Sequence, residues 1–170
     1  KMAEYERGNG FIKTKDFTDN ATVNFEPAFN ILGDDEDYIK SVEMLKSICQ
    51  DAVGDYVKML FLDTICANPD RHTFNFGVLR DSDTGEILGL APNFDNNMAL
   101  IARGYPKKST SKDLLICLFN ELLDNHPMYK AYLPKLDEST VKEILDKINM
   151  KVKRQEITDF VMSRYSFIKK

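Results

Sequence analysis

The sequence ANPDRHTFNFG, residues 67–77, concentrates polar side chains directly behind an apolar segment. Residues 51–67 are apolar over most of a helical circumference, which is typical of a helix in the middle of a core. Pro69 stops helices, so the polar residues that follow it are predicted to lie on a loop. One acid, two basic side chains and two asparagines fall within this stretch. The sequence therefore predicts a buried helix that leads into a polar loop.

A β-hairpin is predicted directly after this loop. Residues 74–80 and 86–91 have the pattern of strands, and DSDTG, residues 81–85, has the composition of a turn. Pro92 ends the second strand, and NFDNN, residues 93–97, follows as a loop. Because an antiparallel hairpin brings its two ends together, we expect Asn75 and Asp95 to be neighbours.

Asp70, Asn75 and Asp95 together match the needs of phosphoryl transfer. A carboxylate beside an amide oxygen offers hard ligands that suit Mg²⁺. A second carboxylate a few residues upstream is suited to accept a proton from an attacking hydroxyl or to orient it. Protein kinases use a loop aspartate, an asparagine five residues later and a further aspartate on the next loop. The same spacing separates Asp70 from Asn75 here.

Each of these residues also has a structural interpretation. The tripeptide N-P-D, residues 68–70, is by itself a helix-ending turn. A lone histidine such as His72 is more often structural than catalytic, and Asp81 and Asp83 are typical turn residues. The combination of D-R-H, the hairpin and Asp95 in a proline-led loop favours a kinase-type site over these alternatives.

The motif resembles a known family. D-R-H stands where eukaryotic protein kinases have H-R-D, and N-F-D-N-N stands where they have D-F-G. The run N-x-D-R-H-x-x-N, followed by a hairpin and LAPNFDNN, resembles the bacterial HipA-like serine/threonine kinases, whose namesake is the toxin kinase of a toxin–antitoxin pair. D-R-H-x-x-N also resembles the phosphoinositide 3/4-kinase branch of the same superfamily, but the A-P-x-x-D run at 91–95 favours the HipA-like interpretation. The resemblance covers about residues 60–100.

The resemblance implies a role for each residue of the motif. Asp70 would be the catalytic base or the acid that orients the substrate. Asn75 and Asp95 would hold the Mg²⁺ that bridges the phosphates of ATP. Arg71 and His72 would organise the loop or contact phosphates.

The amino-terminal residues are predicted to form a second hairpin. Residues 3–17 contain two short strand-like runs around the turn Gly8-Asn9-Gly10. No G-x-G-x-x-G or P-loop motif occurs in the sequence. We therefore interpret residues 1–20 as the remnant of a kinase N-terminal lobe with its hinge, which would place Phe11 near the adenine. Lys13 and Lys15 are either nucleotide contacts or, as is usual for lysines on strands, solvated.

The rest of the chain, within residues 21–170, is predicted to be a helical, kinase-like C-terminal lobe. A capping box of Thr140 and Glu143 predicts a helix that runs to about Met150. The fold class is therefore mainly α with small β-hairpins (α+β). Apolar periodicity and end signals predict the remaining helices over residues 34–50, 51–67, 111–125 and 153–168.

Composition narrows the function classes. The 170-residue chain has a net charge of −4, which gives no basic footprint for nucleic acid. No apolar run approaches the length of a membrane span, and no leader is visible, although the chain opens on Lys1 rather than on methionine. Cys49, Cys66 and Cys117 form no C-x-x-C pair, so we expect reduced, buried thiols and a cytoplasmic location.

The main hypothesis is an ATP- and Mg²⁺-dependent phosphotransferase that acts on Ser or Thr of a protein, with an antitoxin-like protein as a possible partner. A lipid or small-molecule kinase is the alternative within enzymes, and the acidic composition disfavours it. A different class is a non-catalytic partner-binding module of a toxin–antitoxin or mobile-element regulator that retains a kinase-like lobe. Neither a membrane nor direct nucleic-acid binding is expected.

Overall fold

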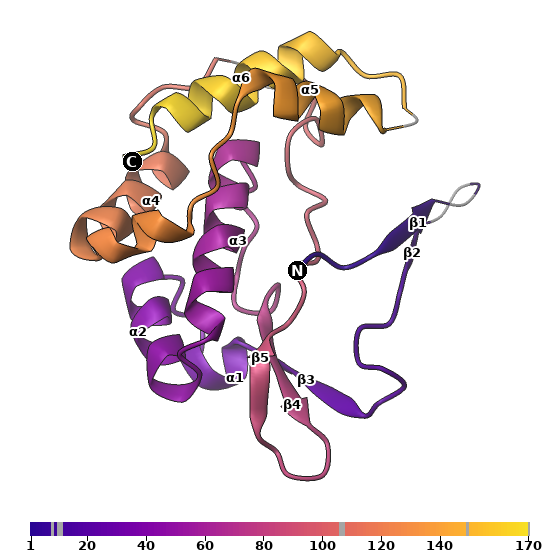
Figure 1. Cartoon of the computed structure of the whole chain (residues 1–170), viewed down its shortest axis with the longest axis vertical. Coiled ribbons are helices and arrows are strands. Elements are labelled where there is room, and N and C mark those ends of the chain that lie inside the picture. The colour runs from indigo at the N-terminus through magenta and orange to yellow at the C-terminus, as the bar shows by residue number, and fades with distance from the viewer. Residues whose placement is uncertain (8, 10–11, 106–107, 149, 170) are drawn as a thin grey trace. The chain divides into compact units, whose positions relative to one another are not determined.

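The structure is a computed structural model that describes residues 1–7, 9, 12–105, 108–148 and 150–169 (Figure 1). The chain forms two compact units. Unit 1 comprises residues 1–59 and 70–95, and unit 2 comprises residues 60–69 and 96–170. Helix α3 (Ala52–Cys66) contributes its first turns to unit 1 and its last turns to unit 2. Helices together with two small antiparallel sheets confirm the predicted α+β class.

Unit 1 begins with the predicted amino-terminal hairpin. Strands β1 (Tyr5–Arg7) and β2 (Ile12–Thr14) pair antiparallel, with Tyr5 opposite Thr14. Of the predicted turn, Gly8 and Gly10 lie outside the described residues. Residues 1–20, the predicted lobe remnant, all belong to unit 1.

A three-stranded sheet follows, in the order β3-β4-β5, with strands β3 (Val23–Pro27), β4 (Gly77–Asp81) and β5 (Ile87–Leu90). The predicted β4–β5 hairpin is confirmed, but its first strand begins at Gly77 rather than at residue 74. Strand β3, which was not predicted, pairs antiparallel with β4 along its whole length. Gly77 explains the close pairing, because a Cβ there would lie 2.1 Å from the carbonyl oxygen of Glu26.

The helices of unit 1 begin with the short helix α1 (Phe29–Leu32), which was not predicted. Helix α2 (Tyr38–Ile48) starts where the acidic cluster ends, because the Asp37 carboxylate accepts hydrogen bonds from the backbone of Ile39 and Lys40. One side of the first turns of α3 is buried, whereas Asp55 and Lys58 on the same turns form an exposed ion pair. On the buried side, Tyr56 packs against Phe76 with ring centroids 5.0 Å apart.

Unit 2 is helical. It contains α4 (Leu114–Asn125), the 3₁₀ helix η1 (Pro127–Tyr132), α5 (Glu138–Asp146) and α6 (Arg154–Ser166). The predicted capping box was wrong: Asp137 caps α5 by accepting from the backbone N–H of Thr140, which places Thr140 inside the first turn. This helix also ends at Asp146 and not near Met150.

A buried arginine ties unit 2 together. Arg164, on α6, is 1% exposed, and its guanidinium makes a bidentate ion pair with Asp113, the residue that caps α4. Its Nε donates to the carbonyl oxygen of Thr64 on α3 at 2.5 Å. The hydrogen bonds from Arg164 hold the pKa of Asp113 below its ordinary value. One side chain therefore links three helices of this unit.

The cysteines only partly follow the prediction. All three are free thiols, but none is fully buried: Cys49 and Cys66 are partly buried and Cys117 is exposed. Burial raises the pKa of Cys66 to about 12, so this thiol stays protonated. Among the described residues, no helix is long and apolar enough to cross a membrane.

Candidate active site

The loop that leaves α3 is anchored at its first residue. Asn68 is buried, its backbone N–H donates to the carbonyl of Asp63 at 2.9 Å, and its Nδ2 donates to Oδ1 of the same residue at 2.8 Å. Ala67 adopts a positive φ of 52°, which turns the chain out of the helix. Asn68 is thus part of a helix-ending turn, while Asp70 lies beyond it.

Arg71 joins the two ends of the β4–β5 ribbon. Arg71 is buried, with 7% of the residue exposed. A single atom, Nη1, donates to the carbonyl oxygen of Asn75 at 2.6 Å and to that of Phe94 at 2.7 Å. The backbone beside Asp95 is therefore held against the backbone of Asn75. In this structure the side chain of Arg71 orders the loop by binding backbone carbonyl groups of other residues.

Asn75 is fixed with its amide oxygen unused. Its backbone N–H donates to the carbonyl of His72 at 2.8 Å, and its Nδ2 donates to the carbonyl of Asp70 at 2.8 Å. Because Nδ2 is engaged, Oδ1 occupies the other branch of the amide, and it accepts no hydrogen bond from the described part of the chain. A buried side chain with a fixed, unused oxygen fits a ligand for a hard cation.

Asp95 has an unusual backbone. Its φ is +53°, a left-handed conformation that non-glycine residues adopt uncommonly and that clusters at functional sites. Its backbone N–H donates to the Tyr5 hydroxyl oxygen at 3.2 Å. The preceding residues are held on both sides, because Ala91 N donates to the carbonyl of Gly77 and Ala3 N donates to the carbonyl of Asn93.

The two acids of the predicted site share a property. Asp70 and Asp95 are both partly buried, and neither carboxylate has a hydrogen-bond or ion-pair partner among the residues that the structure describes. The other aspartates that are not fully exposed all have side-chain partners within this part of the chain, as shown for residues 35, 55, 63, 81 and 113. Partly buried carboxylates without partners are costly, so these two are suited to hold a ligand.

The donor set fits Mg²⁺ in the manner of nucleotide enzymes. The described residues contain no group of three or more histidine, cysteine or acidic side chains that could hold a metal. Mg²⁺ commonly takes one or two carboxylates from the protein and completes its shell with phosphate oxygens and water. Asn75 Oδ1 and the Asp95 carboxylate match that pattern. Two protein ligands suit a cation that binds together with a nucleotide, and they are too few to hold a cation by protein groups alone.

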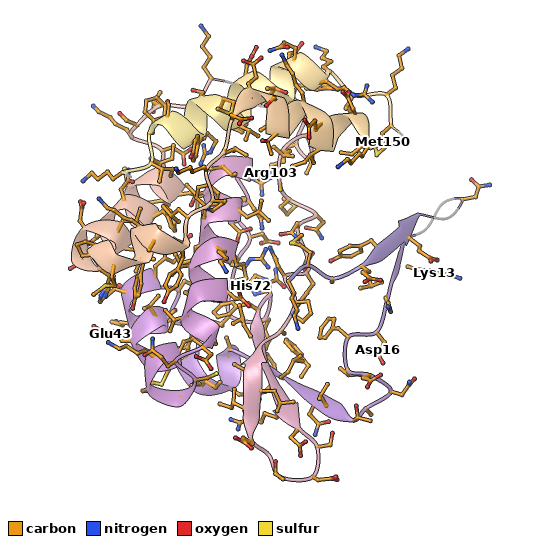
Figure 2. The ribbon with its side chains drawn as sticks, viewed as in Figure 1. Lys13, Asp16, Glu43, His72, Arg103 and Met150 are labelled. Atoms are coloured by element: carbon orange, nitrogen blue, oxygen red, sulfur yellow. The ribbon has the colours of Figure 1, made fainter. Side chains whose placement is uncertain are left out.

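His72 and Phe74 occupy the surface of the same loop. Figure 2 shows His72 beside the end of the β4–β5 ribbon. Its Nδ1 accepts from the backbone N–H of Phe74 at 3.3 Å, and the two rings meet edge to face with centroids 6.1 Å apart. The Nδ1 atom of the imidazole is thus occupied by a hydrogen bond within the loop, and Nε2 lies on the opposite edge of the ring.

The remaining predicted contacts lie on the amino-terminal hairpin. Phe11 falls outside the described residues. Lys13 is exposed, and Lys15 forms an exposed ion pair with Glu4 at 3.3 Å, as solvated strand lysines do.

Sequence reasoning missed several neighbours of Asp95. Tyr5 is ninety positions away, and no local signal indicates its contact with the loop. Phe94 stacks on Phe17 and meets Phe25 edge to face, with centroids 5.8 and 5.5 Å apart. Asn93 is buried, and its side-chain amide has no hydrogen-bond partner in the described part of the chain. Of these, only the aromatic residue next to Asp95 could have been singled out from the sequence.

Comparisons with known proteins identify the fold. No model of a known protein family matches this chain, and no curated protein does. Among solved structures, the chain is similar to the crystal structure of a Helicobacter pylori proinflammatory kinase, CtkA. The TM-score is 0.66 at 16% sequence identity, and the match covers 99% of this chain and 78% of that chain. The chain therefore has a kinase-like fold, as predicted, whereas membership of the HipA-like family stays a prediction.

Proposed function

We propose that this chain supplies the catalytic loop and metal site of an ATP- and Mg²⁺-dependent protein kinase of HipA-like type, which phosphorylates Ser or Thr. The observation that carries the proposal is the double hydrogen bond of Arg71 to the carbonyls of Asn75 and Phe94. It supports the expected convergence of the two ribbon ends, each of which carries an oxygen ligand without a partner. The kinase-like fold supports the same conclusion.

The side chains then have distinct tasks. Asn75 Oδ1 and the Asp95 carboxylate would hold Mg²⁺, which when bound neutralises charge on the transferring phosphoryl group. Asp70 would accept the hydroxyl proton or orient the hydroxyl for in-line attack. Arg71 keeps the two ligand-bearing segments together. The placement of Phe11 near the adenine, the antitoxin-like partner and the cytoplasmic location stay predictions.

The test separates binding from chemistry. Mg²⁺-dependent ATP binding is measured by calorimetry, and phosphoryl transfer from labelled ATP is measured on a degenerate Ser/Thr peptide library. We expect Asp95→Ala to abolish Mg²⁺-dependent binding. We expect Asp70→Ala to bind almost normally but to lose transfer by about 10²–10⁴-fold, the usual contribution of a general base. Asp83→Ala is the matched control, because Asp83 is an exposed turn residue with no side-chain partner in the described chain.

Two results would contradict the proposal. If the full-length wild-type protein binds no Mg²⁺–ATP, the non-catalytic partner-binding module becomes the better interpretation. If Asp70→Ala retains full transfer, Asp70 is neither the base nor the orienting acid.

A further inference from the structure

Phe74 places an exposed aromatic ring in the middle of the proposed catalytic loop. It lies between Asp70 and Asn75 in the sequence, and 50% of the residue is exposed. Its neighbours Thr73 and Asn75 are buried, so the exposed ring does not result from a loosely packed loop. A single exposed hydrophobic residue is ordinary and needs no explanation. Phe74 differs from such a residue because its ring packs on a second aromatic ring, that of Phe29.

The ring of Phe74 is held rigidly on a second aromatic ring. It stacks on Phe29, the first residue of α1, with centroids 4.3 Å apart and planes inclined by only 17°. The backbone N–H of Phe29 donates to the carbonyl of Thr73 at 2.9 Å, which fixes α1 to the loop. His72 closes one edge, through its ring and through the hydrogen bond from the backbone N–H of Phe74 to Nδ1. The outward face of Phe74 is therefore preorganised.

The chemistry of this surface favours an apolar partner. The rings that Phe74 meets are those of Phe29 and His72, so its exposed face belongs to an aromatic cluster. Rigid aromatic rings bury large areas at little entropic cost, and for that reason they dominate recognition surfaces.

We infer that Phe74, supported by Phe29, is a specificity-determining residue that receives an apolar side chain of the protein substrate close to the acceptor Ser or Thr. The inference rests on the proposed function. A hydroxyl placed at Asp70 brings its own polypeptide over the loop surface, and Phe74 is the exposed apolar side chain on that surface between Asp70 and Asn75. The contact is made equally in the ground state and in the transition state, so it acts on KM and not on kcat.

The test uses paired peptides and the full chain. Each peptide carries one Ser, and the residues from three before to three after it are replaced in turn by Leu, Phe, Ala, Arg or Glu. We expect wild-type transfer to favour Leu or Phe at one of these positions. Phe74→Ala should raise KM for the favoured peptide by about tenfold, with kcat changed less than twofold, and should erase the preference over Ala.

Two further variants give the comparison its controls. Phe74→Leu should restore part of the preference, because it restores apolar area at the same place. Leu88→Ala should have no effect, since Leu88 is similarly exposed, at 54%, but lies on strand β5 of the same unit. Peptide binding in the presence of a non-hydrolysable ATP analogue, followed by fluorescence polarisation, repeats the measurement without turnover.

The outcomes distinguish this inference from the proposed function. Transfer with no flanking preference, a preference for Arg, or a preference that survives Phe74→Ala would overturn the role of Phe74 and leave the kinase assignment standing. Absence of both Mg²⁺–ATP binding and transfer in the full-length wild-type protein would overturn the proposed function, and this inference with it.

Discussion

Replacing Arg71 tests whether a single side chain holds the two ends of the β4–β5 ribbon together. The change Arg71→Ala removes Nη1, which donates to the carbonyls of Asn75 and Phe94 at 2.6 and 2.7 Å. Both acceptors lose a charged donor inside unit 1, and a cavity forms where the buried stem of Arg71 lay. The backbone on either side of the proposed metal ligands is then free to separate.

The magnitude follows from the two bonds. A hydrogen bond from a charged donor contributes about 1.5–3 kcal/mol. The segments keep other ties, including the bond from Asn75 N to the carbonyl of His72, so we expect a net loss of about 3 kcal/mol, the lower end for two such bonds. For a chain of this size, that corresponds to a fall in Tm of about 6–12 °C. Because small displacements of ligating groups are costly, the affinity for Mg²⁺–ATP should fall by at least about tenfold.

The assay combines thermal unfolding with calorimetric titration of Mg²⁺–ATP at a temperature where the variant is fully folded. Arg71→Lys should lie between wild type and Arg71→Ala, because an ammonium keeps the charge but not the reach of the guanidinium. Arg103→Ala is the control, since Arg103 is exposed and has no side-chain partner in the described chain. A folded Arg71→Ala protein that binds Mg²⁺–ATP as well as wild type would refute the reasoning, whatever its Tm.

Three further changes test the packing around the site and in unit 2. Gly77→Ala should cost about 1–3 kcal/mol in guanidinium unfolding, because the new Cβ would lie 2.1 Å from the Glu26 carbonyl oxygen; an unchanged midpoint would contradict the β3–β4 pairing. Arg164→Ala should cost about 3 kcal/mol by calorimetry, as expected when the buried partner of a part-buried ion pair is lost together with its packing; a loss under about 1 kcal/mol would show that the pair with Asp113 matters little. Hydrogen bonds to the α5 cap lower the pKa of Asp137 from 3.8 to about 2, so its stabilisation is complete above pH 3.8 and is lost as the pH falls towards 2. Between pH 3.8 and 2, the Asp137→Asn variant should therefore lose less stability than the wild type. Acid titrations followed by circular dichroism measure both losses. Equal losses would show that the charge of the cap is unimportant.

The longer helices and the second hairpin could be predicted because their signals are local. Apolar periodicity marks α3 and α4, and the turn D-S-D-T-G marks the β4–β5 connection. Strand β3 could not be predicted in this way, because its pattern is short, ends in proline and is completed only by pairing with β4. The start of α5 was misplaced since Asp137 and Thr140 both belong to cap-forming residue types, and only the backbone geometry decides between them.

The candidate site likewise has a part that local sequence indicates and a part that only tertiary contacts create. The spacing of Asp70, Asn75 and Asp95 is visible in the sequence, because one hairpin links the two loops. The means of holding them is not visible. Arg71 acts on backbone carbonyls, which leave no sequence pattern, and Tyr5 reaches Asp95 from a distant hairpin. Sequence spacing thus indicated the candidate ligands, while the contacts that support them form only in the folded chain.

The left-handed backbone at Asp95 bears on how this chain diverges over time. At a φ of +53°, asparagine and glycine are accommodated as readily as aspartate, and each is one nucleotide change away from an aspartate codon. A gene copy can therefore exchange the acid in one mutational step and still encode a folded product. Descendants that serve only as scaffolds should then arise readily from such an ancestor, and the residue at this position is the first place to look for them in genomes.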